Sequence, residues 1–152
     1  MKQQLILGAL FVLGVFSLAV PATHASSITM IGDTAIITLD FGFSATGGDY
    51  EVPVIASSTV GYFDRVDELG YSVTGADIVS ASGLVLSQAS LSENNRYAVN
   101  NDDSATFTVF IIAKLANITD ELTATITKIP YWVNGTRTTV HENQLNELEP
   151  AI

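Results

Sequence analysis

Apolar and polar residues alternate most regularly in two stretches of the chain, residues 34–43 and 105–115. Every second residue of the first stretch is apolar: Ala35, Ile37, Leu39, Phe41 and Phe43. The matching set in the second stretch is Ala105, Phe107, Val109, Ile111, Ala113 and Leu115. Because successive side chains of a strand point to opposite faces of the sheet, each set predicts the core-facing side of a β-strand. We expect residues 105–115 to be the central strand, with Phe110 and Ile112 on its other face, partly covered by a neighbouring element.

Shorter runs with strand character flank these two stretches. We expect an edge strand at Ile28–Ile31, joined to the next strand by a tight turn at Gly32-Asp33. We also expect a strand at Tyr50–Ile55. Pro53 lacks a backbone N–H and therefore favours an edge position for that strand.

The middle of the chain predicts strands that are short and separated by polar residues. Asp77–Ala81 and Leu84–Leu86 are two strand candidates, with Ser82-Gly83 between them as a bulge or a turn. Tyr97 and Val99 share one face of a further strand, and Asn100–Ser104 forms the polar turn that leads into the central strand.

The apolar phase changes once near the C-terminal end. Leu122, Ala124 and Ile126 alternate with threonines, whereas from residue 129 the apolar positions are Ile129, Tyr131 and Val133. One residue has therefore been added near Lys128-Ile129, which predicts a β-bulge that also accommodates Pro130. Asn134-Gly135 predicts a two-residue hairpin turn, with Thr138–His141 as the returning strand.

These elements define the expected fold class. About seven to nine short strands, with turns at short intervals and no helix of ordinary length, are typical of two packed antiparallel sheets. A parallel sheet would require crossover helices. We therefore expect an all-β, two-sheet antiparallel β-sandwich of the immunoglobulin-like kind.

Residues 1–25 have the features of a secretory signal peptide. Lys2 precedes the apolar run Leu5–Val20, and small residues stand just before a cleavage site after Ala25. The run is shorter than the roughly 20 residues that a membrane-spanning helix needs, and an uncleaved N-terminal anchor is the alternative. We expect one domain, residues 26–152, with no membrane span after cleavage.

The charge and the residue types exclude several classes of function. The net charge is −10, and cleavage would remove Lys2 and make the chain more negative. Like charge repels phosphate backbones and anionic lipids, so we expect no nucleic-acid partner. It also opposes self-association, so a monomer is favoured over self-assembly through the C-terminal edge strand. Cysteine is absent, which excludes disulfides, thiol nucleophiles and iron–sulfur clusters.

Two longer stretches, Thr38–Pro53 and Tyr97–Ile111, have a familiar order of features. A Phe-rich strand runs into a Gly-Gly-Asp turn, and a later Tyr-x-Val is followed by an acidic turn and a Phe-Thr-rich strand. Together with a Thr-rich strand and the segment ITKIPYW, they resemble the exported immunoglobulin-like β-sandwich domains of bacterial cell-surface proteins. The resemblance spans most of residues 27–148. It implies the fold and export, and it brings no catalytic or binding residue.

Candidate chemistry is sparse. His141 is the one histidine after residue 25, and the sequence has no nucleophile motif, so we expect a surface histidine rather than a catalytic one. Asn100, Asp102 and Asp103 carry the oxygen atoms that calcium takes, although without EF-hand spacing, and a solvated turn is the alternative. Tyr131 and Trp132 are candidates for stacking on a sugar, with core packing as the alternative.

These observations favour an exported, non-enzymatic structural or interaction module of the bacterial cell surface or the medium. We expect no cofactor, and the protein or glycan partner stays unidentified. The alternative is a carbohydrate-binding module that uses Trp132 and Tyr131. A glycoside-type hydrolase is a third hypothesis, because paired carboxylates of such enzymes assemble in space and leave no local pattern.

Overall fold

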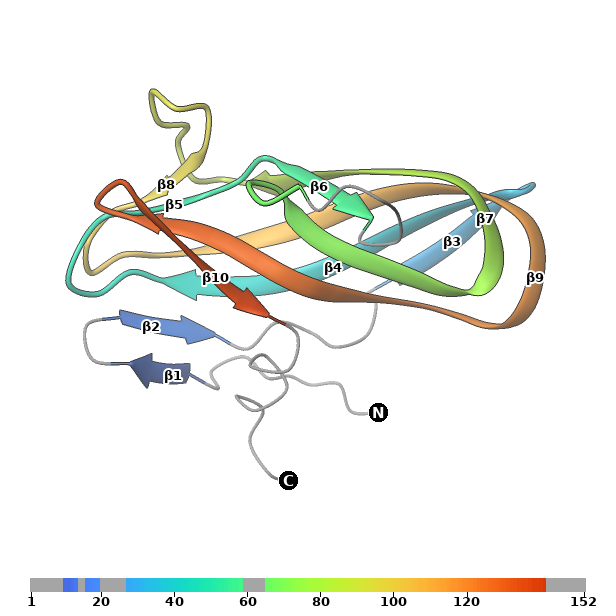
Figure 1. The fold of residues 1–152 in the computed structure, drawn as a ribbon, viewed down its shortest axis with the longest axis horizontal. Coiled ribbons are helices and arrows are strands. Elements are labelled where there is room, and N and C mark those ends of the chain that lie inside the picture. Colours follow the sequence, from blue (N-terminus) through green and yellow to red (C-terminus); the bar gives the residue numbers. More distant parts are fainter. Residues whose placement is uncertain (1–9, 14–15, 20–26, 59–64, 142–152) are drawn as a thin grey trace.

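The computed structural model describes residues 10–13, 16–19, 27–58 and 65–141 of the 152-residue chain, and Figure 1 shows their arrangement. Ten strands make up this part of the chain. Their bounds are β1 Leu10–Leu13, β2 Phe16–Ala19, β3 Ser27–Ile31, β4 Thr34–Ser44, β5 Tyr50–Val52, β6 Ile55–Ser58, β7 Leu69–Ser87, β8 Tyr97–Val99, β9 Ser104–Val133 and β10 Thr136–His141.

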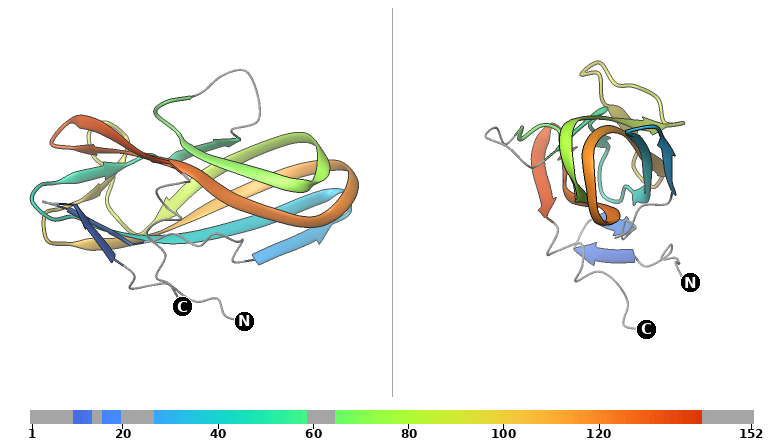
Figure 2. Two further views of the ribbon diagram at one scale, coloured as in Figure 1. Left: turned by 60° about the horizontal axis from the view of Figure 1, so that its bottom comes forward. Right: turned by 90° about the vertical axis from the view of Figure 1, so that its right-hand side faces the viewer.

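All ten strands belong to one antiparallel sheet, which confirms the all-β class. The sheet curls so that its strands surround the core when the molecule is seen from its end (Figure 2). The described residues thus form one continuous curled sheet, where we expected two separate ones. Strands β3 to β10, which follow residue 26, agree with the expected number.

The two longest strands, β7 and β9, run antiparallel along almost their whole length. The first half of β7 pairs with the second half of β9, from Gly70 opposite Lys128 to Thr74 opposite Thr123. The second half of β7 pairs with the first half of β9, from Ala76 opposite Ile118 to Ser87 opposite Phe107. Both strands double back at the same end of the molecule (Figure 1). β7 and β9 therefore form one two-stranded ribbon, which folds back on itself and supplies strands to both sides of the core.

At the bend of this ribbon, β7 is the inner strand and contributes a glycine. β9 is the outer strand and contributes extra residues. From Thr74 to Ala76 the pairing on β9 moves from Thr123 to Ile118, so β9 takes the longer path. Gly75 stands at the turn with φ +92, and a Cβ added there would lie 2.1 Å from the Glu121 carbonyl oxygen. Only glycine fits this position without movement of the backbone.

The predicted break in β7 at Ser82-Gly83 is wrong. The strand is continuous there, and these two residues pair regularly with Ile112 and Ile111. Gly83 instead allows close packing, since a Cβ would lie 2.9 Å from the Tyr71 ring and 3.1 Å from Ala56.

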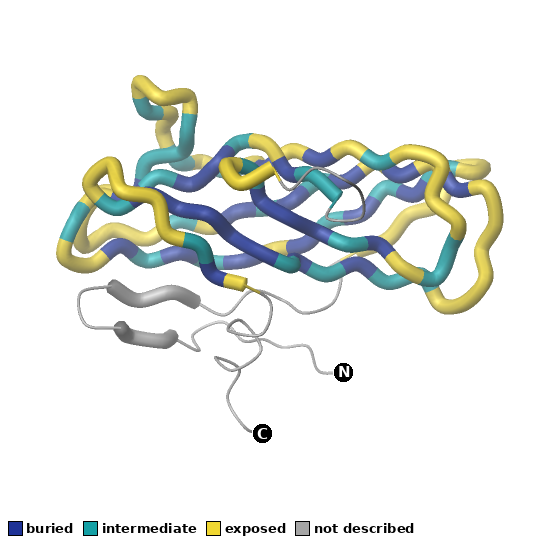
Figure 3. Tube along the Cα trace, viewed as in Figure 1, coloured by how far each residue is buried: buried dark blue, intermediate teal, exposed yellow. Residues whose placement is uncertain are grey.

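The core faces of the two regular strands are confirmed. The alternate residues Ala35 to Phe43 of β4 are buried, and so are those from Phe107 to Leu115 of β9. The two strands pair in register, with Phe41 opposite Phe107. Figure 3 shows the buried positions along the middle of the strands and the exposed ones at both ends of the molecule.

The predicted bulge and hairpin near the C-terminal end are also confirmed, but Pro130 lies outside the bulge, opposite Thr139 of β10. Gly70 pairs with Lys128 and Tyr71 with Ile126, so Thr127 is the extra residue on β9. The bulge buries Lys128, whose ammonium group donates to the Arg65 carbonyl oxygen at 3.0 Å. Asn134 and Gly135 both have positive φ, as a type I′ turn requires, and β10 returns along β9.

The expected single edge strand Tyr50–Ile55 is wrong. Pro53 separates β5 from β6, because it lies between them and need not donate to either ladder. Strand β5 is not at an edge, since Tyr50 pairs with Val99 of β8 and with Val133 of β9.

Strands β1 and β2 lie within the segment that the sequence predicts to be a signal peptide. They pair with each other, and β2 pairs with β4 through Ser17–Ser44 and Leu18–Phe43. The remaining residues of that segment lie outside the described part of the chain. Cleavage after Ala25 stays a prediction. The buried core identified among the described residues extends from Ala35 to Val140.

Candidate interaction surface

The outward side of the sheet carries a connected group of exposed apolar side chains, which we call the outer apolar patch. Cross-strand pairs join its members, because directly opposed residues share a face. Ile36 lies opposite Ile112, Phe110 opposite Leu84, and Leu84 opposite Ile55. Leu86 is two residues from Leu84 on the same strand. The patch therefore comprises Ile36, Ile55, Leu84, Leu86, Phe110 and Ile112, from β4, β6, β7 and β9.

Four members of the patch are well exposed: Leu84 at 53%, Leu86 at 46%, Ile55 at 45% and Ile112 at 45%. Ile36 and Phe110 are half-buried. We expected a neighbouring element to cover Phe110 and Ile112 in part, and of the two Ile112 is the more exposed. Single exposed apolar residues are ordinary, whereas a contiguous group often marks an interaction site.

Polar pairs bound the patch at both ends. On one side, the Thr108 hydroxyl donates to the Asp40 carboxylate at 2.6 Å. On the other, the Lys114 ammonium lies 3.7 Å from the Asp33 carboxylate. The patch is thus an apolar area between two satisfied polar contacts.

Trp132, a candidate for sugar stacking, lies beneath an arginine. The Arg96 guanidinium carbon is 3.5 Å from the centroid of the Trp132 ring, and the indole is only 6% exposed. Arg96 also lies 3.1 Å from the Glu51 carboxylate, which further accepts from Asn94. In this arrangement the indole offers no open face to a sugar.

The same contacts set the pKa of Glu51. Burial raises the pKa of this carboxyl, but hydrogen bonds from Ser92, Arg96 and Asn94, together with the charge of Arg96, bring the pKa below its ordinary value. Glu51 is therefore an anion that holds Arg96 over Trp132. A general acid would need the opposite shift.

Tyr131, the second candidate for sugar stacking, is a core residue. It is 1% exposed and stacks on Tyr50 at 5.6 Å between ring centroids, while Phe43 contacts it edge-on at 5.3 Å. Burial, with a contribution from Tyr50, raises the pKa of Tyr131 to about 12. Burial likewise raises the pKa of Tyr71 to about 12.

Hydrogen bonds join the acidic turn Asn100–Asp103 to the turn after β4. Asn101 Oδ1 accepts from the backbone N–H of Gly47 at 2.7 Å and of Gly48 at 3.0 Å. The Asn101 N–H donates to Asp49 Oδ1 at 2.9 Å. Backbone hydrogen bonds from Asp102 N–H to the Ala45 carbonyl and from Ala45 N–H to the Asp103 carbonyl join the same turns.

The candidate calcium residues Asn100, Asp102 and Asp103 are exposed side chains of this turn. The Asp102 carboxylate accepts from the Asn101 amide at 3.3 Å. Within the described residues, no three acidic, histidine or cysteine side chains are grouped as a metal site would need. The calcium site stays an untested hypothesis.

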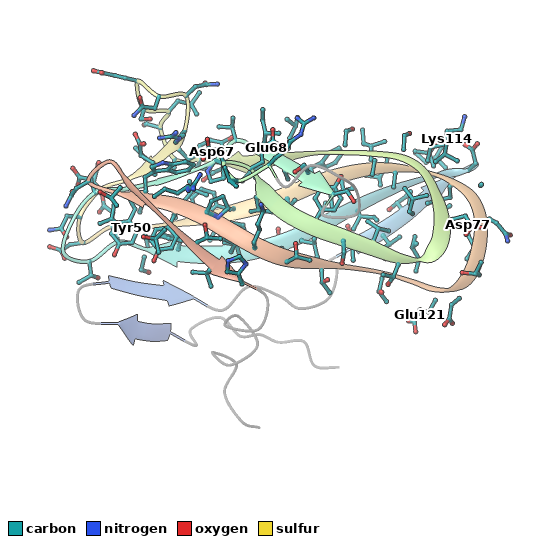
Figure 4. All side chains as sticks on the ribbon, viewed as in Figure 1. Tyr50, Asp67, Glu68, Asp77, Lys114 and Glu121 are labelled. Carbon is teal, nitrogen blue, oxygen red and sulfur yellow. The ribbon has the colours of Figure 1, made fainter. Side chains whose placement is uncertain are left out.

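His141 and the carboxylates are also dispersed. His141 is exposed at the end of β10, opposite Lys128. Asp77 and Glu121 lie near the bend with Lys114, whereas Asp67 and Glu68 lie toward the other half of the molecule (Figure 4). Asp67 accepts from Arg137 at 2.6 Å and Glu68 from Arg65 at 3.3 Å, as structural ion pairs do.

We did not predict three features from the sequence: the outer apolar patch, the position of Arg96 over Trp132, and the hydrogen bond that Asp49 accepts from Asn101. Phe110 and Ile112 were a signal for the patch, since both break the polar face of the central strand. The contacts of Arg96 and Asp49 join residues far apart in sequence, and no local pattern indicates them.

No helix among the described residues is long and apolar enough to cross a membrane. Comparisons of the chain with known protein families, with characterised proteins and with solved structures found no match.

Proposed function

We propose that this chain is an exported, non-enzymatic interaction module that binds another protein through the outer apolar patch. Within this proposal the domain is a β-sandwich of the immunoglobulin-like kind, and it acts at the bacterial cell surface or in the medium. The outer apolar patch is the observation that carries the proposal. A strongly acidic chain has no need of exposed leucine and isoleucine for solubility, so their presence in one group favours a binding role.

The chemistry of the patch indicates the kind of partner. Leu84, Leu86 and Ile112 offer an exposed apolar area on the outward side of the sheet, which suits an apolar surface of a folded protein. The net charge of −10 favours a partner with a neutral or basic rim. Anionic lipid and nucleic acid fit poorly because their charge has the same sign.

A test is to follow where the exported protein goes in the producing cells. Leu84→Thr combined with Ile112→Thr removes the centre of the patch while keeping residue types that suit a strand. We expect wild type to be retained on the envelope and the double variant to be released into the medium.

Ile118→Thr is the matched control, because Ile118 is 54% exposed but lies at the bend, away from the patch. It should distribute like wild type. Equal distribution of the double variant and wild type would contradict the patch as the binding site.

Carbohydrate binding is the second candidate, and the geometry supports it less. It would require Arg96 to move off Trp132, since the ring is covered in this conformation. Reproducible binding on a glycan array, lost in Trp132→Ala with the fold intact, would favour it over the protein-binding proposal.

A further inference from the structure

Strand β3, Ser27–Ile31, is an open edge of the sheet in the part of the chain that the structure describes. It pairs with β4 on one side only, and all five of its residues are exposed. None is charged and none is proline. Exposed edges usually carry such residues, because these prevent pairing with other chains. Strand β10, another edge, does carry a charge at Arg137.

The hydrogen-bonding groups that β3 presents to the open side follow from its hairpin. The turn Gly32-Asp33 has two residues, and such a turn closes on a hydrogen-bonded pair, here Ile31 and Thr34. Because hydrogen-bonded and non-hydrogen-bonded pairs alternate, Thr29 directs its N–H and C=O toward β4. Ile28 and Met30 therefore direct theirs toward the open edge.

We propose that this edge pairs with β3 of a second copy of the chain, antiparallel, about a two-fold axis that passes through Thr29. Ile28 then lies opposite Met30 of the second copy, and Met30 opposite its Ile28. Both residues of each pair direct N–H and C=O at one another, so the four groups on each strand are all satisfied. Thr29 faces Thr29 of the second copy as a non-hydrogen-bonded pair.

The side chains suit the same register. Ile28 and Met30 are on the core-facing side of the sheet, because their partners on β4, Ile37 and Ala35, are fully buried. At the edge they are 36% and 40% exposed. In the proposed pair they cover one another across the two-fold axis. A shift by one residue would place core-facing side chains against outward-facing ones.

Charge does not oppose this contact locally. The net charge of −10 favours a monomer, but Ser27–Ile31 is neutral. Asp33, the charge nearest to β3 along the hairpin, pairs with Lys114 of β9. Distant charges are screened beyond about 8 Å at physiological salt. An edge contact of this size is smaller than a standard interface, so the dimer should be weak and concentration-dependent.

The test is sedimentation velocity of the purified protein at physiological salt over about a hundredfold range of concentration. Wild type should form dimers as the concentration rises. Thr29→Lys places two like charges face to face and should weaken the dimer about tenfold or more. Thr29→Glu should do the same alone. An equal mixture of the two variants should restore dimers, because Thr29 meets only itself across the axis.

Thr138→Lys is the control, since Thr138 is exposed on the edge strand β10. It should dimerise like wild type, with Trp132 fluorescence confirming that every variant is folded. Wild type with the mass of one chain at all concentrations would overturn the proposal. So would dimers that persist in Thr29→Lys or are lost in Thr138→Lys, or a mixture of the two Thr29 variants that stays monomeric. The inference does not depend on the outer apolar patch.

Discussion

Asp49 and Asn101 hold the turn after β4 and the turn before β9 together, although they are far apart in sequence. The Asn101 N–H donates to Asp49 Oδ1 at 2.9 Å, and the Asn101 side chain in turn accepts from Gly47 and Gly48, beside Asp49. The side chain of each residue thus accepts hydrogen bonds from backbone N–H groups of the other residue's turn. The two turns form one end of the molecule, where Asn134 N–H also donates to the Asp49 carbonyl at 3.2 Å.

Asn101→Ala should lower the free energy of unfolding by about 0.5 to 1.5 kcal/mol, because two exposed backbone N–H groups exchange their acceptor for water. Urea denaturation measures this. Asn100→Ala, in the same turn, removes a side chain that takes no part in these hydrogen bonds and should cost much less. Equal costs would show that the contact between the two turns contributes little.

Gly75→Ala should be among the most destabilising single changes in the chain. A Cβ at this position meets the Glu121 carbonyl oxygen at 2.1 Å, and φ is +92. Gly135→Ala is a matched control, because φ is +85 but nothing lies within 4 Å of the added Cβ. The control should cost about 1 to 2 kcal/mol from backbone strain alone, and Gly75→Ala clearly more. Similar denaturation midpoints would contradict the bend as described.

Phe107→Ala should lower the free energy of unfolding by about 3 to 5 kcal/mol, since a buried ring is lost and a cavity remains. Phe107 is 1% exposed and stacks on Phe41 with 5.1 Å between ring centroids. Thr106→Ala, on the exposed face, should change it by roughly 0.5 kcal/mol or less. A denaturant melt in which the two cost the same would mean that the register of β9 is wrong.

Stability should fall steeply at alkaline pH. Burial raises the pKa of Tyr71 and of Tyr131 to about 12, so the fold favours the neutral phenols. Their contribution is complete below the unfolded pKa of about 10 and is lost as the pH rises through the folded value. Between the unfolded and the folded pKa, each tyrosine lowers the free energy of unfolding by at most ~1.4 kcal/mol per pH unit.

Urea denaturation at a series of pH values measures this loss. Tyr131→Phe should reduce the slope above pH 10, whatever its effect at neutral pH, because one titrating group has gone. A free energy of unfolding that stays constant from neutral pH to pH 11.5 would contradict the prediction.

Arg96→Ala should uncover the indole of Trp132. Trp132 is the single tryptophan of the chain, and the Arg96 guanidinium lies 3.5 Å from its ring centroid. The emission maximum should move to longer wavelength and acrylamide should quench the fluorescence more strongly. Arg65→Ala removes an arginine that is paired with Glu68, so it should leave the spectrum unchanged. If quenching is the same in all three proteins, Arg96 does not shield the ring in solution.

Local patterns in the sequence determined which faces of the strands are buried. The alternation of Phe107, Val109 and Ile111 predicts their burial because the side-chain period of a strand is a local property. The turn at Asn134-Gly135 and the bulge near Lys128 were predictable for the same reason. Each requires a dihedral preference or a phase change that a few neighbouring residues set by themselves.

Only the tertiary structure decided how these strands meet. Gly75, rather than Ser82-Gly83, marks the bend of the long ribbon, because the need for glycine comes from Glu121 on the partner strand. Trp132 is covered because Arg96 lies over it. The exposure of Ile112 depends on which elements pack against its face. These features depend on contacts between residues distant along the chain, and the alternation of apolar residues carries no information about such contacts.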